Sequence, residues 1–251
     1  MSRPAPFARA AIAQTAVELR LTTRRGENLL AMLGIPAAVL LLFGSAEVLP
    51  APASESRVDA LLPGILALAI VATGLVNLGI ATAYERSYGV LKRLGGSPLG
   101  RPGLITAKIL AVLVIEILLL VLLTALATGV LGWRPAGPVA WPLLIASVGL
   151  GTATFAGFGL AMAGALRAEA TLLLANVLFL IVLAVGGILV PVADLPEPMN
   201  LLAAILPPAA LTEALRVALG SGLDSDPRTV IVLAVWAVIA VTLAIRAFRW
   251  D

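Results

Sequence analysis

The chain has 251 residues, of which 61% are hydrophobic and only 12% charged, and its formal net charge is +3. An ordinary soluble domain carries about 25% charged residues, so this composition excludes water as the main solvent of the chain. Cysteine and histidine are both absent, which excludes disulfides and thiol chemistry and removes the commonest metal ligand and general base. We therefore expect no catalytic residue, no metal site and no cofactor bound by this chain.

Residues 1–27 are predicted to form an amphipathic leader on the cytoplasmic side of a membrane. Apolar side chains share one face of a helix over residues 5–25: Ala8, Ile12, Ala16 and Leu19. The polar residues, Glu18 among them, lie elsewhere around the helix. Such a helix can lie flat on the inner leaflet with its arginines near anionic headgroups. A partly disordered basic leader is the alternative.

Long stretches with almost no charge predict six membrane spans. A bilayer core about 30 Å thick requires roughly 20 apolar residues per helix. The stretches that meet this length are residues 28–48, 60–83, 108–131, 140–166, 170–191 and 229–247. The sequence thus predicts an all-α integral membrane protein, with residues 1–251 forming a single transmembrane domain.

Glu116 is the one charged residue inside these stretches away from their ends. An intramembrane carboxylate is a candidate functional group, because burying it in lipid is costly. Near the cytoplasmic end of its helix it can equally hydrate or pair with Lys108, which is a structural role. Both interpretations of Glu116 stay open.

The stretch 140–166 is rich in small residues at four-residue spacing. Four of them follow one face of the helix: Ala153, Gly157, Ala161 and Ala165. Small residues let a second helix approach closely within a membrane. Packing inside the subunit is favoured over a dimer face or a substrate path.

A shorter apolar stretch, residues 199–212, contains Pro207 and Pro208. It is too short to cross a bilayer and is interrupted by proline, so we expect a re-entrant hairpin over residues 195–218.

Basic residues are distributed unevenly between the two sides of six spans. Thirteen fall on the side that holds both termini and four on the other side. Because the side richer in Lys and Arg faces the cytoplasm, both termini are expected there. These residues stand in short loops beside the spans, so they indicate topology and contact with anionic lipid rather than nucleic-acid binding.

The loop over residues 84–103 carries the most informative pattern of the chain. Its apolar residues can form one short helical face: Val90, Leu91 and Leu94. Its charged residues are expected to stay in water: Glu85, Arg86, Lys92 and Arg93. Gly95-Gly96 and Pro98 then end the helix. A short helix held between two spans is suited to passing a push from a cytoplasmic motor to the membrane helices.

This loop resembles that of the permease subunits of type-2 ABC transporters. The family loop has an acidic-basic pair, a glycine, a Leu-Lys-Arg-Leu-like stretch, a small residue with proline and leucine, and a lysine that opens the next span. The residues that fit are Glu85, Arg86, Gly89, Leu91, Lys92, Arg93, Leu94, Ser97, Pro98, Leu99 and Lys108. The resemblance implies partner coupling through Glu85, Arg86, Gly89, Leu91, Lys92, Arg93 and Pro98.

A second segment resembles the broken helical hairpin of the same family. Its residues are Leu206 to Arg216, with Pro207 and Pro208 before a Glu-Ala-Leu-Arg sequence that starts at Glu213. The resemblance implies a hairpin that shapes the outer exit, with Pro207, Pro208, Glu213 and Arg216 as its marker residues.

The resemblance also implies the partners. It predicts a homodimer, or a heterodimer with a related permease, docked to ABC ATPase subunits. The chain has no Gly-x-x-x-x-Gly-Lys-Ser/Thr phosphate loop, so we expect ATP-Mg and its hydrolysis to belong to the partner and this chain not to be an enzyme.

The expected function is therefore export of a hydrophobic or amphipathic substrate, such as a drug, an antibiotic or a lipid-like compound, across a bacterial cell membrane. Two other classes are less well supported. A proton- or ion-coupled carrier would have only Glu116 as an ionisable group near the midplane. An intramembrane enzyme would lack histidine, cysteine and clustered carboxylates within its spans.

Overall fold

The computed structural model describes residues 6–24, 26–45, 57–96, 99–187, 196–197, 200, 203, 205–220 and 226–249. Within these ranges the regular elements are all helical, which confirms the all-α prediction. The elements are α1 (Phe7–Thr23), α2 (Gly26–Ser45), α3 (Arg57–Val71), η1 (Ala72–Leu78), α4 (Gly79–Ser87), α5 (Val90–Leu94), α6 (Gly100–Gly129), α7 (Trp141–Ala165), α8 (Ala168–Val185), α10 (Pro207–Ala218) and α11 (Pro227–Ala247).

Four helices in the described ranges are long and apolar enough to cross a bilayer. They are the continuous helix of α3, η1 and α4 over Arg57–Ser87, then Gly100–Gly129, Trp141–Ala165 and Pro227–Ala247. Shorter apolar helices cover Met32–Ser45 and Ala168–Ala184, in the places of the first and fifth expected spans. The protein is thus a membrane protein built of apolar helices. Four of the six predicted spans are described helices long enough to cross a bilayer.

Two of these helices extend beyond the predicted spans. The second span was expected to end at residue 83, but α4 continues to Ser87. The third was expected to begin at Lys108, but α6 begins at Gly100. Charged residues do not end a helix when their side chains find partners, and Lys108 has such partners on neighbouring helices.

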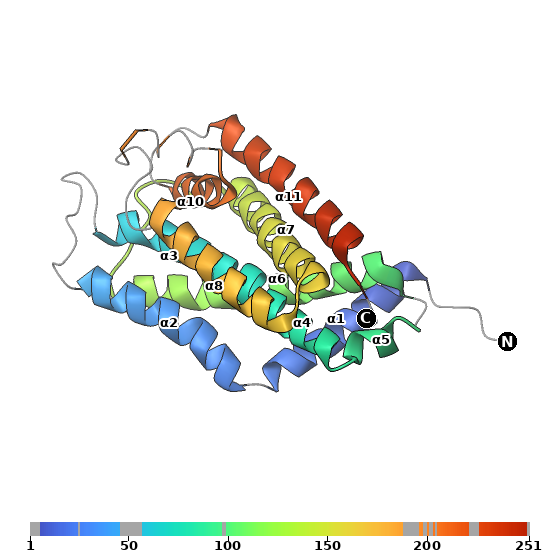
Figure 1. Cartoon of the computed structure of the whole chain (residues 1–251). Helices are drawn as coiled ribbons and strands as arrows, with labels where there is room; N and C mark the ends of the chain where they lie inside the picture. Colours follow the sequence, from blue (N-terminus) through green and yellow to red (C-terminus); the bar gives the residue numbers. More distant parts are fainter. Residues whose placement is uncertain are drawn as a thin grey trace.

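The long helices run in the same general direction and leave the short helices at opposite ends of the bundle (Figure 1). At one end, α1, α5 and the last turn of α11 lie together; we call this the α5 end. Leu91 of α5, Leu104 of α6 and Phe248 after α11 share one buried cluster there. The other end, where α10 lies, is called the α10 end.

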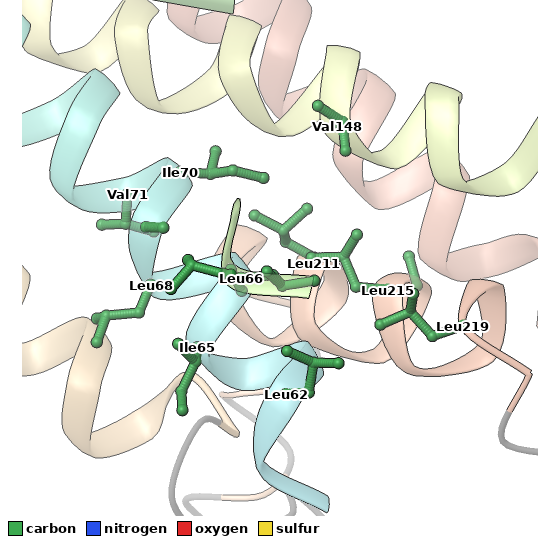
Figure 2. Packing of buried hydrophobic residues seen from close by; sticks show 14 of the residues in the cluster. Leu62, Ile65, Leu66, Leu68, Ile70, Val71, Val148, Leu211, Leu215 and Leu219 are labelled. Atoms are coloured by element: carbon green, nitrogen blue, oxygen red, sulfur yellow. The ribbon is translucent and has the colours of Figure 1, made fainter. Parts of the chain in front are cut away.

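Leucine-rich faces of α3 and α10 form the core near the α10 end. Leu62 and Leu66 of α3 point toward Leu211 and Leu215 of α10 (Figure 2), and Ile65 belongs to the same buried cluster. All five side chains are buried. Since α10 has only 12 residues, it is about 18 Å long and too short to cross a bilayer.

Glycines of α7 let neighbouring helix backbones touch. A Cβ on Gly159 would lie 2.5 Å from the carbonyl oxygen of Gly74 in η1, and a Cβ on Gly157 would lie 2.8 Å from the backbone of Ala240 in α11. Helices approach this closely only where one of them carries no side chain. The small residue at Gly157 therefore serves packing inside the subunit, the alternative favoured by the sequence.

The expected hairpin over residues 195–218 is described mainly in its second half. Helix α10 begins at Pro207 and Pro208, which suit the first helical turn because proline lacks the N–H that would be unpaired there. In the first half, the described residues are Pro196, Glu197, Asn200, Ala203 and residues 205–206. The rest of that half lies outside the described residues.

Candidate functional site

The predicted coupling loop contains the short helix α5, and its two faces differ sharply. Leu91 is fully buried and Leu94 packs beside it against α6 and the end of α11. Lys92 and Arg93 are exposed on the opposite side. Val90, which the sequence placed on the apolar face, is 42% exposed. One face of α5 therefore seats the helix on the bundle while the other presents two cations to the surroundings.

A glycine joins α5 to the preceding span. Gly89 has φ +71°, in the left-handed region where glycine is favoured. Its N–H donates to Arg86 O at 2.9 Å and so ends α4. This turn fixes the angle at which α5 leaves the membrane helix. Pro98, the last residue of the predicted coupling set, lies outside the described residues.

Glu85 and Arg86 belong to the last turn of α4 rather than to the loop helix, and both bind other helices of this chain. Arg86 donates from Nη1 to Gly164 O at 2.6 Å and from Nη2 to Leu166 O at 2.5 Å. These carbonyls end α7 and begin the turn to α8, so one guanidinium caps a helix end through two hydrogen bonds. The coupling loop is thereby tied to α7.

Glu85 forms part of a buried ionic cluster that joins three helices. Lys108 Nζ of α6 lies 2.8 Å from Glu85 Oε2 of α4 and 3.0 Å from Glu18 Oε2 of α1. The Lys108 side chain is 1% exposed. A buried ammonium is tolerated only where carboxylates replace its hydration. We call Glu18, Lys108 and Glu85 the Lys108 cluster.

The sequence did not single out Glu18, which it placed on the wet side of the leader. The helix instead turns Ala11 and Glu18 toward the bundle and exposes Ile12 and Val17. Two features of the sequence could have indicated the pairing. Glu18 is the one acidic residue among the first 26, and Lys108 is one of only two lysines in the chain.

Glu116 lies near the middle of α6, about 24 Å from its start, and is 1% exposed. Its Oε2 is in hydrogen-bonding contact with Thr152 Oγ1 of α7, and its Oε1 has no hydrogen-bond partner. The pairing with Lys108 considered from the sequence is not formed, because Lys108 is engaged by Glu18 and Glu85. Glu116 is thus a deeply buried carboxyl with one free oxygen.

The marker residues of the hairpin lie together in α10 at the end opposite α5. Pro207 and Pro208 are buried in its first turn. Arg216 is 8% exposed, and its Nε lies 3.6 Å from Oε2 of Glu213, whose side chain is 51% exposed. A further bond, from Trp236 Nε1 of α11 to Ile205 O at 2.9 Å, holds the segment before α10. Helix α10 is thus held by its buried first turn and by this bond to the segment before it.

Comparison with known protein families gives one match. The model of the family described as ABC-2 type transporter matches residues 11–219. That range includes most of α1, the Lys108 cluster, α5 and α10. A search of curated proteins found no significant match. Since the family model covers well over half of the chain, this protein belongs to the ABC-2 type transporter family and is a membrane-spanning permease subunit of an ABC transporter.

Proposed function

We propose that this permease subunit exports a hydrophobic or amphipathic substrate, driven by ATP hydrolysis in a separate ABC ATPase subunit. Members of its family normally work with such a subunit. The observation that carries the proposal is α5, which is firmly seated through Leu91 and presents Lys92 and Arg93 outward. We assign partner docking to this exposed face.

The contacts of Glu85 and Arg86, just before α5, offer two routes by which a displacement of α5 is transmitted to other helices. Arg86 leads to the carbonyls that end α7, and Glu85 leads through Lys108 to α6 and α1. Both are short polar contacts, which hold the helix ends in a fixed relation. A displacement of the loop by a docked ATPase would therefore reach three other helices, and the hairpin with α10 would shape the exit at the opposite end.

We further propose six spans, completed by α2 and α8, with both termini and α5 on the cytoplasmic side of a bacterial cell membrane. The asymmetry of thirteen basic residues against four supports this orientation. The hairpin before α11 would then enter the outer leaflet without crossing, which the short length of α10 favours.

Pairing with a second permease, of the same or a related sequence, is also proposed. Helix α8 presents exposed apolar side chains, among them Leu173 and Leu180, and the exposed amide of Asn176. That amide donates to Leu172 O in its own helix at 2.7 Å. An amide on the outside of an apolar helix favours contact with another helix, because lipid offers no hydrogen-bond partner.

Co-purification in mild detergent tests the ATPase proposal. A subunit that contains a phosphate loop is expected to co-elute with the wild-type permease. The double variant Lys92→Ala/Arg93→Ala should lose most of this subunit and of the substrate-stimulated ATPase activity, with normal membrane abundance. The matched control is Arg134→Ala/Arg228→Ala, which removes two exposed arginines from the α10 end. Full ATPase retention by the first variant would defeat the docking assignment.

A proton- or ion-coupled carrier that uses Glu116 is the second candidate, favoured by the free Oε1 of that buried carboxyl. The two candidates respond differently to their energy sources. ATP depletion should stop transport by the ABC permease, whereas dissipation of the proton gradient should stop transport by the carrier. Glu116→Gln with unchanged transport and abundance would remove the carrier candidate.

A further inference from the structure

A small cavity of about 60 Å³ lies beside the Lys108 cluster, between α1, α2, η1 and α6. It exceeds the space that a single water molecule needs. Glu18, Glu85 and Lys108 line it together with two polar residues of η1, Thr73 and Asn77. Polar and charged groups therefore line part of the cavity, although it lies among apolar helices.

Two carboxylates and one ammonium give the lining a formal charge of −1. Three of the four carboxylate oxygens have donors. Lys108 binds Glu18 Oε2 and Glu85 Oε2, and Gln14 Nε2 donates to Glu18 Oε1 at 2.8 Å. The fourth, Glu85 Oε1, takes part in none of the hydrogen bonds formed by the described residues, and the Glu85 side chain is 20% exposed. Among the described residues, Glu85 thus keeps one carboxylate oxygen available for a further donor, and the lining has a net formal charge of −1.

The wall formed by η1 is independently unusual. A π-helix of seven residues replaces the α-helix at Ala72–Leu78, in the middle of a span. Such segments are rare and occur frequently at functional sites. Thr73, Asn77 and Leu78 of this segment all face the cavity. The departure from α-helical geometry therefore coincides with the cavity wall.

The exposure of the lining residues shows where the cavity opens. Its floor includes Thr73 and Lys108, both 1% exposed. Leu21 of α1, by contrast, is 48% exposed, and Met32 of α2 is half-buried. The mouth therefore lies between α1 and α2. Leu21 and Met32 at the mouth are apolar, whereas the buried part of the lining includes Thr73 and Lys108.

We propose that this cavity binds the ammonium group of an amphipathic amine that enters from the cytoplasmic leaflet. The ammonium would pair with Glu85 Oε1 and bring the charge of the cluster to zero, while the apolar part would leave between Leu21 and Met32. The proposal rests on the proposed function for the side of the membrane and names a substrate class for it.

Binding is measured on the permease subunit in phosphatidylcholine nanodiscs with dansylcadaverine, a fluorescent amphipathic primary amine. Its N-acetylated derivative keeps the shape and removes the charge. Saturable binding of the amine above that of empty nanodiscs is expected, with an affinity at least about tenfold higher than for the acetylated probe, the loss expected on removing a charge-assisted hydrogen bond. Equal binding of the two probes by wild-type protein would overturn the proposal.

Two variants locate the site. Glu85→Gln removes the charge and Val112→Phe fills the cavity without changing charge, and each should weaken dansylcadaverine binding at least about tenfold. Glu169→Gln removes an exposed carboxylate from the first turn of α8, outside the cavity lining, and should change nothing. Unchanged affinity for dansylcadaverine in either folded cavity variant contradicts the assignment. If neither variant folds, the comparison of dansylcadaverine with its acetylated derivative on wild-type protein tests the proposal.

The amine could be a membrane aminophospholipid or a free compound. Replacing part of the phosphatidylcholine by phosphatidylethanolamine separates the two sources. A fall in dansylcadaverine affinity identifies the lipid as the occupant, whereas constant affinity identifies a free amine. These measurements use no ATPase, so a failure of the amine site leaves the docking experiment intact and the reverse also holds.

Discussion

At the scale of single residues, the contact between Glu116 and Thr152 bears on whether the Glu116 carboxyl carries a proton. Thr152 Oγ1 lies 2.7 Å from Val148 O and is also in contact with Glu116 Oε2. A hydroxyl has one hydrogen and can donate it to one of these oxygens. If it donates to Val148, the carboxyl must donate to Thr152. An ionised carboxylate with one donor would be costly to bury, so the geometry favours a neutral acid.

A double-mutant cycle tests this pair. Thr152→Val should lower the free energy of unfolding by about 1–3 kcal/mol, because it leaves Glu116 with no partner. In a Glu116→Leu background the same change should cost much less. Glu116→Gln, which resembles the neutral acid, should stay within roughly 1 kcal/mol of wild type. Thermal unfolding in nanodiscs provides the comparison, and equal costs of Thr152→Val in both backgrounds would exclude the coupling.

At the scale of elements, the seam between α7 and η1 joins two backbones with no side chain between them. Gly159 and Gly74 form its centre, since a Cβ on Gly159 would lie 2.5 Å from Gly74 O. Gly149, two to three turns earlier on the same helix, has nothing within 4 Å of the corresponding position. A comparison of substitutions at Gly159 and Gly149 therefore distinguishes the effect of close packing from that of helix propensity.

Replacing each glycine by alanine should have opposite effects. Gly159→Ala must separate two backbones and is expected to cost about 1–3 kcal/mol of unfolding free energy. Gly149→Ala should be neutral or stabilise by up to about 1 kcal/mol, since alanine favours the helix. Detergent-induced unfolding measures both variants. A Gly159→Ala protein as stable as the Gly149→Ala protein would show that the two backbones separate without loss of unfolding free energy.

The sequence predicted some of these elements and not others. Uncharged runs were sufficient for the long helices, and Pro207 marked where α10 begins, whereas the break at Gly89 between α4 and α5 was not predicted. The direction of the Glu85 side chain was not predictable, because its partner Lys108 is 23 residues away and the contact depends on the packing of α4. The π-helix has no comparable mark in the sequence, because its form depends on close contact with α7.

At the scale of the whole molecule, the absence of cysteine makes the proposed topology directly testable. Single cysteines can be placed at exposed positions of each end without a background signal. With six spans and a cytoplasmic α5, a membrane-impermeant thiol reagent added outside intact cells should label Arg134→Cys and Glu197→Cys. It should label Arg24→Cys and Arg93→Cys only after the membrane is opened.

Two of these positions decide whether the shorter helices α2 and α8 cross the membrane. Labelling of Arg24→Cys from outside would show that α2 does not cross, because Arg57 at the start of α3 is expected outside. Protection of Glu197→Cys in intact cells would likewise show that α8 does not cross. Arg93→Cys and Arg134→Cys report on α6 alone and serve as the reference pair for the reagent.

The Lys108 cluster also has a consequence for biosynthesis. Glu18 and Lys108 are separated by 90 residues, which a ribosome adds in on the order of 10 s at ordinary rates of translation. During that interval Glu18 lacks Lys108 and α1 cannot settle against α6, so the helix stays at the wet membrane surface. The first helix to be made thus reaches its final position only after α6 has been inserted.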